Sequence, residues 1–262
     1  MQLLSRQEWG DPNAPEQILF IHGWGMNSGV WSDIANDLAQ LFPQKLIRAI
    51  DLPGYGESAN YSLESYNSES LANTIVPFLM AKQSIIIAWS MGGLVAIDLL
   101  SREKYAIEQL ILVSSTPRFV RANDWQDAVE GKLFEDFCQN LSTDHEATLK
   151  RFLAIQSLGS RTAREDIKTL QKQLFSRGKP NIVALESGLN MLLEEDKRAQ
   201  LSAIKDVPIA LISGQKDTLI APQAQQQLAQ QSNIKRFSLP FAGHAPFISH
   251  PQEFKQILKN II

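Results

Sequence analysis

One stretch near the middle of the chain restricts the fold more than any other. Residues 85–88 are an apolar run typical of a buried strand, and residues 94–100 have the pattern of a helix. A chain that passes from strand to helix over so few residues must bend sharply, so large side chains beside the bend would clash. We expect Ser90, at the apex, to be strained, with its Oγ exposed and the helix N-terminus directly behind it.

The residues around Ser90 nearly match a known catalytic motif. In the nucleophile elbow, G-x-S-x-G, a serine stands on such a turn with small residues on either side. Gly92 occupies the last position of the motif, but Ala88 stands at the first, so the match is one residue short of the consensus. Taken alone, the motif also fits an ordinary strand–helix turn with a serine N-cap.

Two other residues stand where a serine esterase needs them. Asp217 follows an expected strand at residues 207–213, and His244 lies in a loop after the next strand, residues 235–239. The order Ser, Asp, His is typical of α/β-hydrolases, and open α/β sheets bind ligands at the carboxyl ends of their strands. The serine needs a histidine to take its proton, and the histidine needs a carboxylate to orient it. We therefore expect Ser90, Asp217 and His244 to form a catalytic triad.

An acyl-transfer site also needs two backbone N–H groups that stabilise the negative charge of the tetrahedral intermediate. Met91, the residue after the serine, supplies one by its position. Our candidate for the second is Trp24, in the loop His22-Gly23-Trp24-Gly25 after an expected strand. The two glycines allow the main chain to approach a ligand closely. We expect His22 to shape this loop rather than to catalyse.

The order of the expected elements indicates the fold class. Strands alternate with helices, which predicts an α/β fold with a mostly parallel, doubly wound sheet. From residue 119 to residue 198 only helical periodicities and polar loops occur. We therefore expect an α/β-hydrolase core of residues 1–117 and 205–262. A helical cap, residues 118–204, would be inserted before the last two core strands.

Composition excludes several other classes of protein. The net charge of −3 gives no excess of Lys and Arg to neutralise nucleic-acid phosphates. The single cysteine excludes an internal disulfide and fits a reducing compartment. Neither a signal peptide nor an apolar run of membrane-spanning length is evident. No nucleotide-binding loop or Cys/His metal cluster is visible. We therefore expect a cytoplasmic monomer that acts without cofactor or metal and binds neither nucleic acid nor membrane.

Five stretches together resemble one family. Residues 22–25, 51–54, 89–96, 151–156 and 243–251 are similar to those of the pimeloyl-[acyl-carrier protein] methyl ester esterases of biotin synthesis. The similarity covers nearly the whole chain, and only Ala88, where that family usually has glycine, departs from it in the elbow. The resemblance implies a carboxylesterase that releases methanol and pimeloyl-[acyl-carrier protein] for biotin biosynthesis. It also implies a substrate site formed by Trp24, Ser90, Met91, Phe152, Leu153, Ala154, Ile155, Gln156 and His244.

The expected cap carries an excess of positive charge. Residues 145–180 contain eight Lys or Arg against three acidic residues, in a chain of net charge −3. Arg161, Arg164, Lys168 and Lys172 recur at helical spacing, which predicts one stripe on a helix face. Such a stripe suits an acidic partner such as acyl-carrier protein, although a solvated helix face is the alternative. The resemblance implies carrier contacts at Arg151, Arg164 and Lys168, to which the stripe adds Arg161.

Two other functions remain open at this point. A general short-chain carboxylesterase or lipase would use the same catalytic residues, so only the cap could distinguish it. A non-catalytic binding protein can also be built on a hydrolase scaffold. Such proteins often lack a member of the triad, whereas Ser90, Asp217 and His244 are all present.

Overall fold

The core of the protein is a seven-stranded, mostly parallel sheet. A computed structural model describes residues 3–79, 82–102, 105–230 and 233–262. The strands lie in the order β1-β3-β2-β4-β5-β6-β7, and β1 pairs antiparallel with β3 while all other pairs are parallel. The parallel α/β sheet expected from the sequence is thereby confirmed. The strands are β1 Arg6–Gly10, β2 Glu16–Ile21, β3 Leu46–Ile50, β4 Gln83–Trp89, β5 Ile107–Val113, β6 Ile209–Gly214 and β7 Ile234–Leu239.

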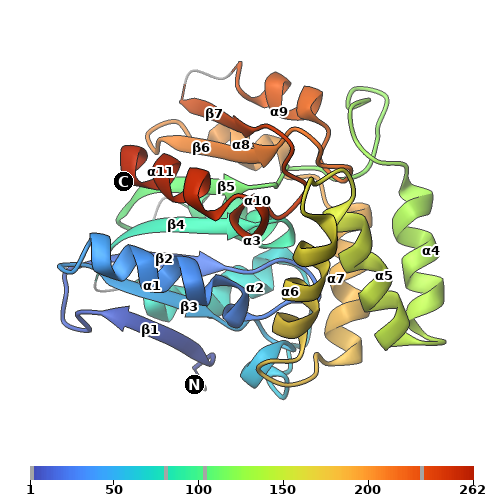
Figure 1. The fold of residues 1–262 in the computed structure, drawn as a ribbon, viewed down its shortest axis with the longest axis horizontal. Helices are drawn as coiled ribbons and strands as arrows, with labels where there is room; N and C mark the ends of the chain where they lie inside the picture. The colour runs from blue at the N-terminus through green and yellow to red at the C-terminus, as the bar shows by residue number, and fades with distance from the viewer. Residues whose placement is uncertain (1–2, 80–81, 103–104, 231–232) are drawn as a thin grey trace.

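Helices cover both faces of the sheet, as a doubly wound fold requires. Helices α1, α10 and α11 lie on the face toward the viewer in Figure 1, and α2 and α3 lie behind it. Short 3-10 turns precede α1, follow β3 and follow α2. The core helices are α1 Ser32–Leu41, α2 Ser68–Ile75, α3 Met91–Leu100, α9 Pro222–Leu228, α10 Pro246–Ser249 and α11 Pro251–Ile261, and the 3-10 turns are η1 Ser28–Trp31, η2 Gly56–Ser58 and η3 Val76–Phe78.

The segment between β5 and β6 is helical, and it stands beside the sheet rather than in it. Between these strands the described chain forms five helices and three isolated β-bridges. Helices α4 to α7 gather at the carboxyl ends of the parallel strands, whereas α8 packs against α3 (Figure 1). The helical insertion before the last two strands agrees with the expected fold class. These helices are α4 Gly131–Leu141, α5 His145–Ser157, α6 Ala163–Leu174, α7 Ile182–Glu194 and α8 Arg198–Ala203.

An aromatic cluster joins the elbow strand to the C-terminal helices. The Trp31 ring stacks on Phe247 with ring centroids 4.2 Å apart, and Trp89 meets both of these rings edge-on. Such pairs add to the free energy gained from burying aromatic area. The cluster fixes the end of β4 against the segment that carries His244.

In the described parts of the chain, no helix combines the length and apolar composition needed to cross a membrane.

Candidate active site

Ser90 stands on a strained turn between β4 and α3. Its backbone has φ 54° and ψ −123°, a conformation that residues other than glycine rarely adopt. Two hydrogen bonds hold it there: the Ser90 N–H donates to Val113 O at 3.0 Å, and Ser115 Oγ donates to Ser90 O at 2.7 Å. Ala88 is fully buried in β4, so its methyl group fits where the consensus has glycine.

The glycines after Ser90 are required by close packing. A methyl group at Gly92 would lie 2.6 Å from the carbonyl oxygen of His22. At Gly93 it would lie 2.0 Å from Ser115 Oγ. Both distances are far shorter than any real contact, so the helix can start this close to the neighbouring loops only with glycine at these positions.

Ser90, His244 and Asp217 form a continuous hydrogen-bonded chain. His244 Nε2 lies 2.9 Å from Ser90 Oγ, and His244 Nδ1 lies 2.9 and 3.0 Å from the two carboxylate oxygens of Asp217. The backbone N–H groups of Leu219 and Ile220 also donate to Asp217 Oδ1. A proton on Nδ1, shared with the carboxylate, leaves Nε2 free to accept the proton of the serine hydroxyl.

Two residues outside the triad hold the loop that carries His244. The Trp89 indole N–H donates to His244 O at 2.9 Å, and the His244 N–H donates to Gln156 O, also at 2.9 Å. Sequence reasoning assigned no role to Trp89. The one rule that could have drawn attention to Trp89 is that a buried indole N–H needs a hydrogen-bond acceptor. Because Gln156 belongs to α5, the inserted helices take part in orienting His244.

The two expected oxyanion donors lie next to the nucleophile. Met91 is the first residue of α3, so its N–H has no acceptor within the helix. The loop of Trp24 reaches the same place, since a methyl group at Gly23 would lie 3.0 Å from Ser90 Cβ. Within the described parts of the chain, the Trp24 N–H makes no backbone hydrogen bond. The Trp24 indole N–H donates to Leu185 O in α7 at 2.8 Å.

The C-terminal half of helix α5 packs against the Trp24 loop and the segments that carry Asp217 and His244. The Phe152 ring packs edge-on against Trp24, with centroids 4.7 Å apart. Leu153 is buried, Ala154 and Ile155 are half-buried, and the Ile155 carbonyl accepts a hydrogen bond from Thr218. Gln156 is buried, and neither polar atom of its amide has a hydrogen-bond partner among the described residues.

Helix α7 lies directly on the oxyanion residues. A methyl group at Gly188 would lie 2.7 Å from Trp24 Cδ1, 2.9 Å from Tyr55 Oη and 3.1 Å from Met91 Sδ. Sequence reasoning missed Gly188, because a glycine inside a helical pattern does not reveal what it packs against. Only 1% of Ser90 is exposed, so the expectation that its Oγ is exposed is wrong in this structure. His244 is fully buried as well, and these helices close the site.

The basic residues of the insertion do not all lie where the sequence predicted. Arg164, Lys168 and Lys172 are exposed on α6, and Arg151 is exposed on α5. The prediction that Arg161 belongs to the same helical stripe is wrong. Arg161 precedes the helix, which begins at Ala163, and its guanidinium stacks on the Phe241 ring at 4.2 Å. The helical spacing of the basic residues continues through the turn at residues 161–162, and nothing in the sequence indicated that the helix begins only after this turn.

Two buried side chains near the Trp24 loop, His22 and Tyr55, have shifted pKa values. Burial lowers the pKa of His22 and outweighs the opposing effects of Gly23 O and the Asp51 charge. Burial also raises the pKa of Tyr55.

Among residues 3–79, 82–102, 105–230 and 233–262, no group of three or more His, Cys, Asp or Glu side chains is placed to bind a metal ion.

Comparison with known proteins identifies the family. A family model described as the alpha/beta hydrolase fold matches residues 17–251. The pimeloyl-[acyl-carrier protein] methyl ester esterase of Pseudoalteromonas atlantica is 37% identical, over 92% of each chain. The enzyme of that name from Photobacterium profundum is 38% identical, over 97% of each chain. An esterase from Exiguobacterium antarcticum has the same fold, with a TM-score of 0.84 at 18% identity over 98% of this chain and 94% of that one.

These matches confirm the resemblance found in the sequence. The chain therefore belongs to the α/β-hydrolase fold family and, within it, to the family of the pimeloyl-[acyl-carrier protein] methyl ester esterases.

Proposed function

We propose that the protein is a serine carboxylesterase that hydrolyses the methyl ester of pimeloyl-[acyl-carrier protein]. The products would be methanol and pimeloyl-[acyl-carrier protein], which enters biotin biosynthesis. The observation that carries the proposal is the hydrogen-bonded chain from Asp217 through His244 to Ser90 Oγ. The names of relatives that align over nearly the whole chain supply the substrate.

Acylation would begin with attack of Ser90 Oγ on the ester carbonyl carbon. The hydroxyl proton moves to His244 Nε2, and Asp217 stabilises the imidazolium that forms. The N–H groups of Trp24 and Met91 donate to the oxyanion of the tetrahedral intermediate. When the intermediate collapses, the C–O bond to the methoxy group breaks. His244 returns its proton to that oxygen, and methanol leaves an acyl-enzyme on Ser90.

Deacylation would repeat these steps with water as the nucleophile. His244 Nε2 takes a proton from the water as the water attacks the acyl carbon, and the same two N–H groups hold the second oxyanion. Collapse breaks the bond to Ser90 Oγ, which recovers its proton from His244. The product is the free carboxylic acid of the carrier-bound chain.

The inserted helices would form the cap that selects the acyl chain. We propose residues 118–204 as this cap domain, with residues 1–117 and 205–262 as the core. The contact of Phe152 with Trp24 supports an acyl site along α5. The buried Gln156 amide supports it further, because polar atoms without partners are costly unless a ligand or water pairs with them. The lining would consist of Trp24, Met91, Phe152, Leu153, Ala154, Ile155 and Gln156.

The carrier protein would dock on the exposed basic side chains of the cap. Arg151, Arg164 and Lys168 are all exposed, which supports a surface complementary to an acidic carrier. Arg161 is also exposed, although its position on Phe241 places it outside the stripe on α6. We include Arg161 at the margin of this surface.

A product assay with the carrier-bound ester tests the function. The purified protein is incubated with methyl pimeloyl-carrier protein, and mass spectrometry follows loss of the methyl group while methanol is quantified. Ser90→Ala should reduce turnover by about 10⁴-fold or more, since the triad acts as a unit. The circular dichroism spectrum of the variant should be unchanged. Turnover near the wild-type rate by a folded Ser90→Ala variant would contradict the proposal.

A further inference from the structure

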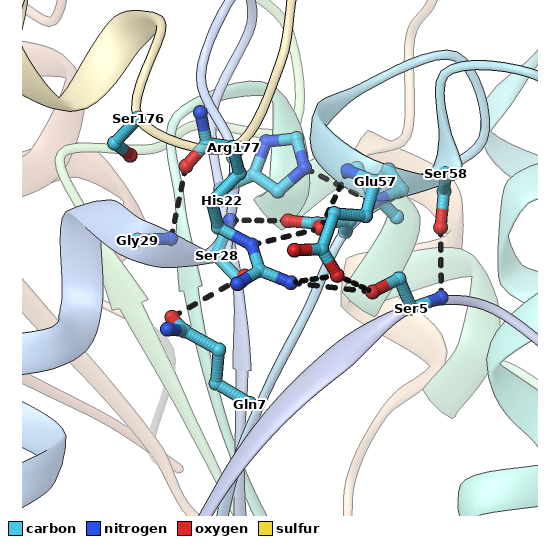
Figure 2. A network of polar contacts seen from close by, with 12 residues as sticks. Ser5, Gln7, His22, Ser28, Gly29, Glu57, Ser58, Ser176 and Arg177 are labelled. Carbon is cyan, nitrogen blue, oxygen red and sulfur yellow. Dashed lines mark hydrogen bonds and ion pairs between the residues drawn. The ribbon is translucent and has the colours of Figure 1, made fainter.

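A single arginine joins the cap to the core beside the active site. Arg177 lies in the loop between α6 and α7, and its side chain is 12% exposed. Figure 2 shows its guanidinium directed at Ser5 and Glu57, with 2.8 Å to Glu57 Oε2 and 3.2 Å to Ser5 Oγ. Its Nε donates to Asp51 Oδ2 at 3.0 Å. Two acidic residues of the core therefore hold one cation of the cap.

Asp51 is the deeper member of this cluster. Its side chain is fully buried directly after β3, and it accepts backbone hydrogen bonds from Ser28 at 2.7 Å and Glu57 at 3.0 Å. A buried carboxylate that loses its cationic partner is strongly destabilising. Among the residues that the structure describes, Arg177 is the cation that forms an ion pair with Asp51, so the core needs the cap to be in place for this charge to be neutralised.

The loop of Trp24 is tied to the same point. At one end, His22 Nε2 accepts a hydrogen bond from Leu52 N at 3.0 Å, and at the other the Ser28 N–H donates to Asp51 (Figure 2). Between these ends lies the N–H that would stabilise the oxyanion. Residues 51 and 52 thus hold both ends of the loop.

The cap holds this loop at a second place. The Asn27 side chain donates to the carbonyls of Gln173 and Leu174, at 3.0 and 3.1 Å, where α6 ends. Arg177 follows only three residues later, so one short segment of the cap contacts both the loop, at Asn27, and the carboxylate of Asp51 that accepts from Ser28. Ser90 is only 1% exposed, so the site is closed while these contacts are made.

We propose that Arg177 is a positioning residue that couples cap closure to assembly of the oxyanion hole. When the cap closes, pairing of Arg177 with Asp51 holds residues 22–28 so that the Trp24 N–H is directed at the oxyanion. When the cap opens, the pairing is lost and the hole is incomplete. This inference rests on the proposed esterase function. It predicts that Arg177 contributes to the rate of the chemical step more than to binding of the ester.

The test uses Arg177→Gln in the full-length protein with a small free methyl ester, so that carrier docking plays no part. We expect kcat to fall about tenfold with little change in KM, less than the 10²–10³-fold expected from removing an oxyanion donor outright. A boronic acid, which forms a tetrahedral adduct on the serine, should also bind about tenfold more weakly. Arg177→Lys, which keeps the charge but not the planar fork, should restore part of both effects.

Lys179→Gln is the matched control, because this exposed cation lies two residues away and makes no ion pair within the described parts of the chain. It should behave as the wild type. Unchanged kcat in a folded Arg177→Gln variant would overturn the inference. A loss of kcat without a loss of boronate affinity would overturn it as well. If the wild type hydrolyses neither this ester nor methyl pimeloyl-carrier protein, the proposed function fails, which is a different outcome.

A double variant keeps the test valid if Arg177→Gln does not fold. Replacing Asp51 by Asn at the same time removes both charges, so no unpaired charge remains buried. We expect Arg177→Gln with Asp51→Asn to fold and to show reduced kcat and boronate affinity. Wild-type values for both in the double variant would overturn the coupling.

Discussion

At Ser90 the backbone has a positive φ, and hydrogen bonds to Val113 O and from Ser115 Oγ hold it there. The sequence predicted this strain correctly, because a five-residue turn from strand to helix leaves few other paths. The departure at Ala88 proved harmless, since its methyl group is buried inside β4. Pattern alone could not show why Gly92 is needed, because the atom that excludes a side chain there belongs to His22, seventy positions earlier.

Gly92→Ala should therefore damage the site. The new methyl group would meet His22 O, so the Trp24 loop or α3 must shift. We expect kcat for a small ester to fall by about 10²-fold, comparable to loss of one oxyanion donor. The free energy of unfolding should fall by about 1–3 kcal/mol, as for other overpacked sites. Steady-state kinetics and urea unfolding measure both. Ala88→Gly is the control and should keep wild-type kcat, and equal kcat in the two variants would refute this explanation.

His22 should make the stability of the protein depend on pH. Burial lowers its pKa below the ordinary value of about 6.5, so the ring is neutral in the folded protein. Its Nε2 accepts the Leu52 N–H and loses that bond on protonation. The unfolded chain binds the proton more readily, so this stabilisation is present above pH 6.5 and is lost as the pH falls below it.

Urea unfolding at pH 8.0, 6.5 and 5.5 should show this loss in the wild type. His22→Gln can still accept the Leu52 N–H but does not titrate, so its stability should change less over the same range. His145→Gln, at the start of α5, is the control and should retain the wild-type slope. Equal slopes for His22→Gln and the wild type would show that His22 is not responsible.

At the scale of single elements, the sequence predicted the existence of helices and strands better than their ends. The pattern of residues 65–80 predicts one helix. The α-helix runs only from Ser68 to Ile75, because Pro77 turns the chain into 3-10 geometry; residue 80 lies outside the described residues. Likewise α6 starts after Arg161, where Ser160 and Thr162 hydrogen-bond to Asp166. Such local hydrogen bonds compete with the hydrogen bonds of a helix. They do not alter the spacing of apolar residues, so this spacing does not reveal where the helix begins.

Ion pairs between side chains hold together the two segments that connect the inserted helices to the sheet. Arg118, leaving the core, pairs with Asp196 at 2.8 Å, and Arg198 pairs with the same carboxylate at 2.6 Å. The Lys197 N–H donates to Pro117 O at 2.7 Å. Hydrogen bonds from Arg198, followed by those from Arg118, lower the pKa of Asp196 to about 2.

Asp196→Asn should weaken this connection in a pH-dependent way. A carboxylate whose pKa is lowered on folding stabilises the protein above its unfolded pKa, near 4, and this is lost as the pH falls toward 2. The variant should therefore be less stable than the wild type at pH 7, and the difference should shrink at pH 3. Denaturant midpoints at both pH values measure it. Asp136→Asn, in an exposed pair with Lys132, should show little change. A difference that stays constant with pH would contradict this account.

At the scale of the whole molecule, the sequence predicted the sheet, the place of the insertion and the family. It could not predict how the inserted helices sit on the sheet. The bonds from Trp24 to Leu185 and from Arg177 to Asp51 join residues more than a hundred positions apart. No spacing rule connects such residues, and in the sequence Arg177 was only one of eight basic residues in an excess of positive charge.

The position of Arg177 also sharpens the prediction about the carrier. The charge of Arg177 is paired with that of Asp51 within the molecule, whereas Arg151, Arg164 and Lys168 are exposed. Replacing these three by Gln should lower kcat/KM for a carrier-bound ester by about tenfold or more at low salt, mainly through KM, and less at high salt. Hydrolysis of a small free ester should not change.

The control carries the same change in net charge elsewhere. Lys205, Lys235 and Lys259 are exposed residues of the core, and their replacement by Gln should leave both substrates unaffected. Equal losses in the two triple variants would indicate a general charge effect and no defined docking surface.

The substrate preference of the wild-type protein distinguishes a carrier-specific esterase from a general one. It is measured as kcat/KM for methyl pimeloyl-carrier protein against kcat/KM for the same methyl ester free of the carrier. We expect the carrier-bound ester to be preferred by about tenfold or more, with one methanol released for each carrier-bound carboxylate formed. An equal or higher value for the free ester would contradict it and indicate a general esterase.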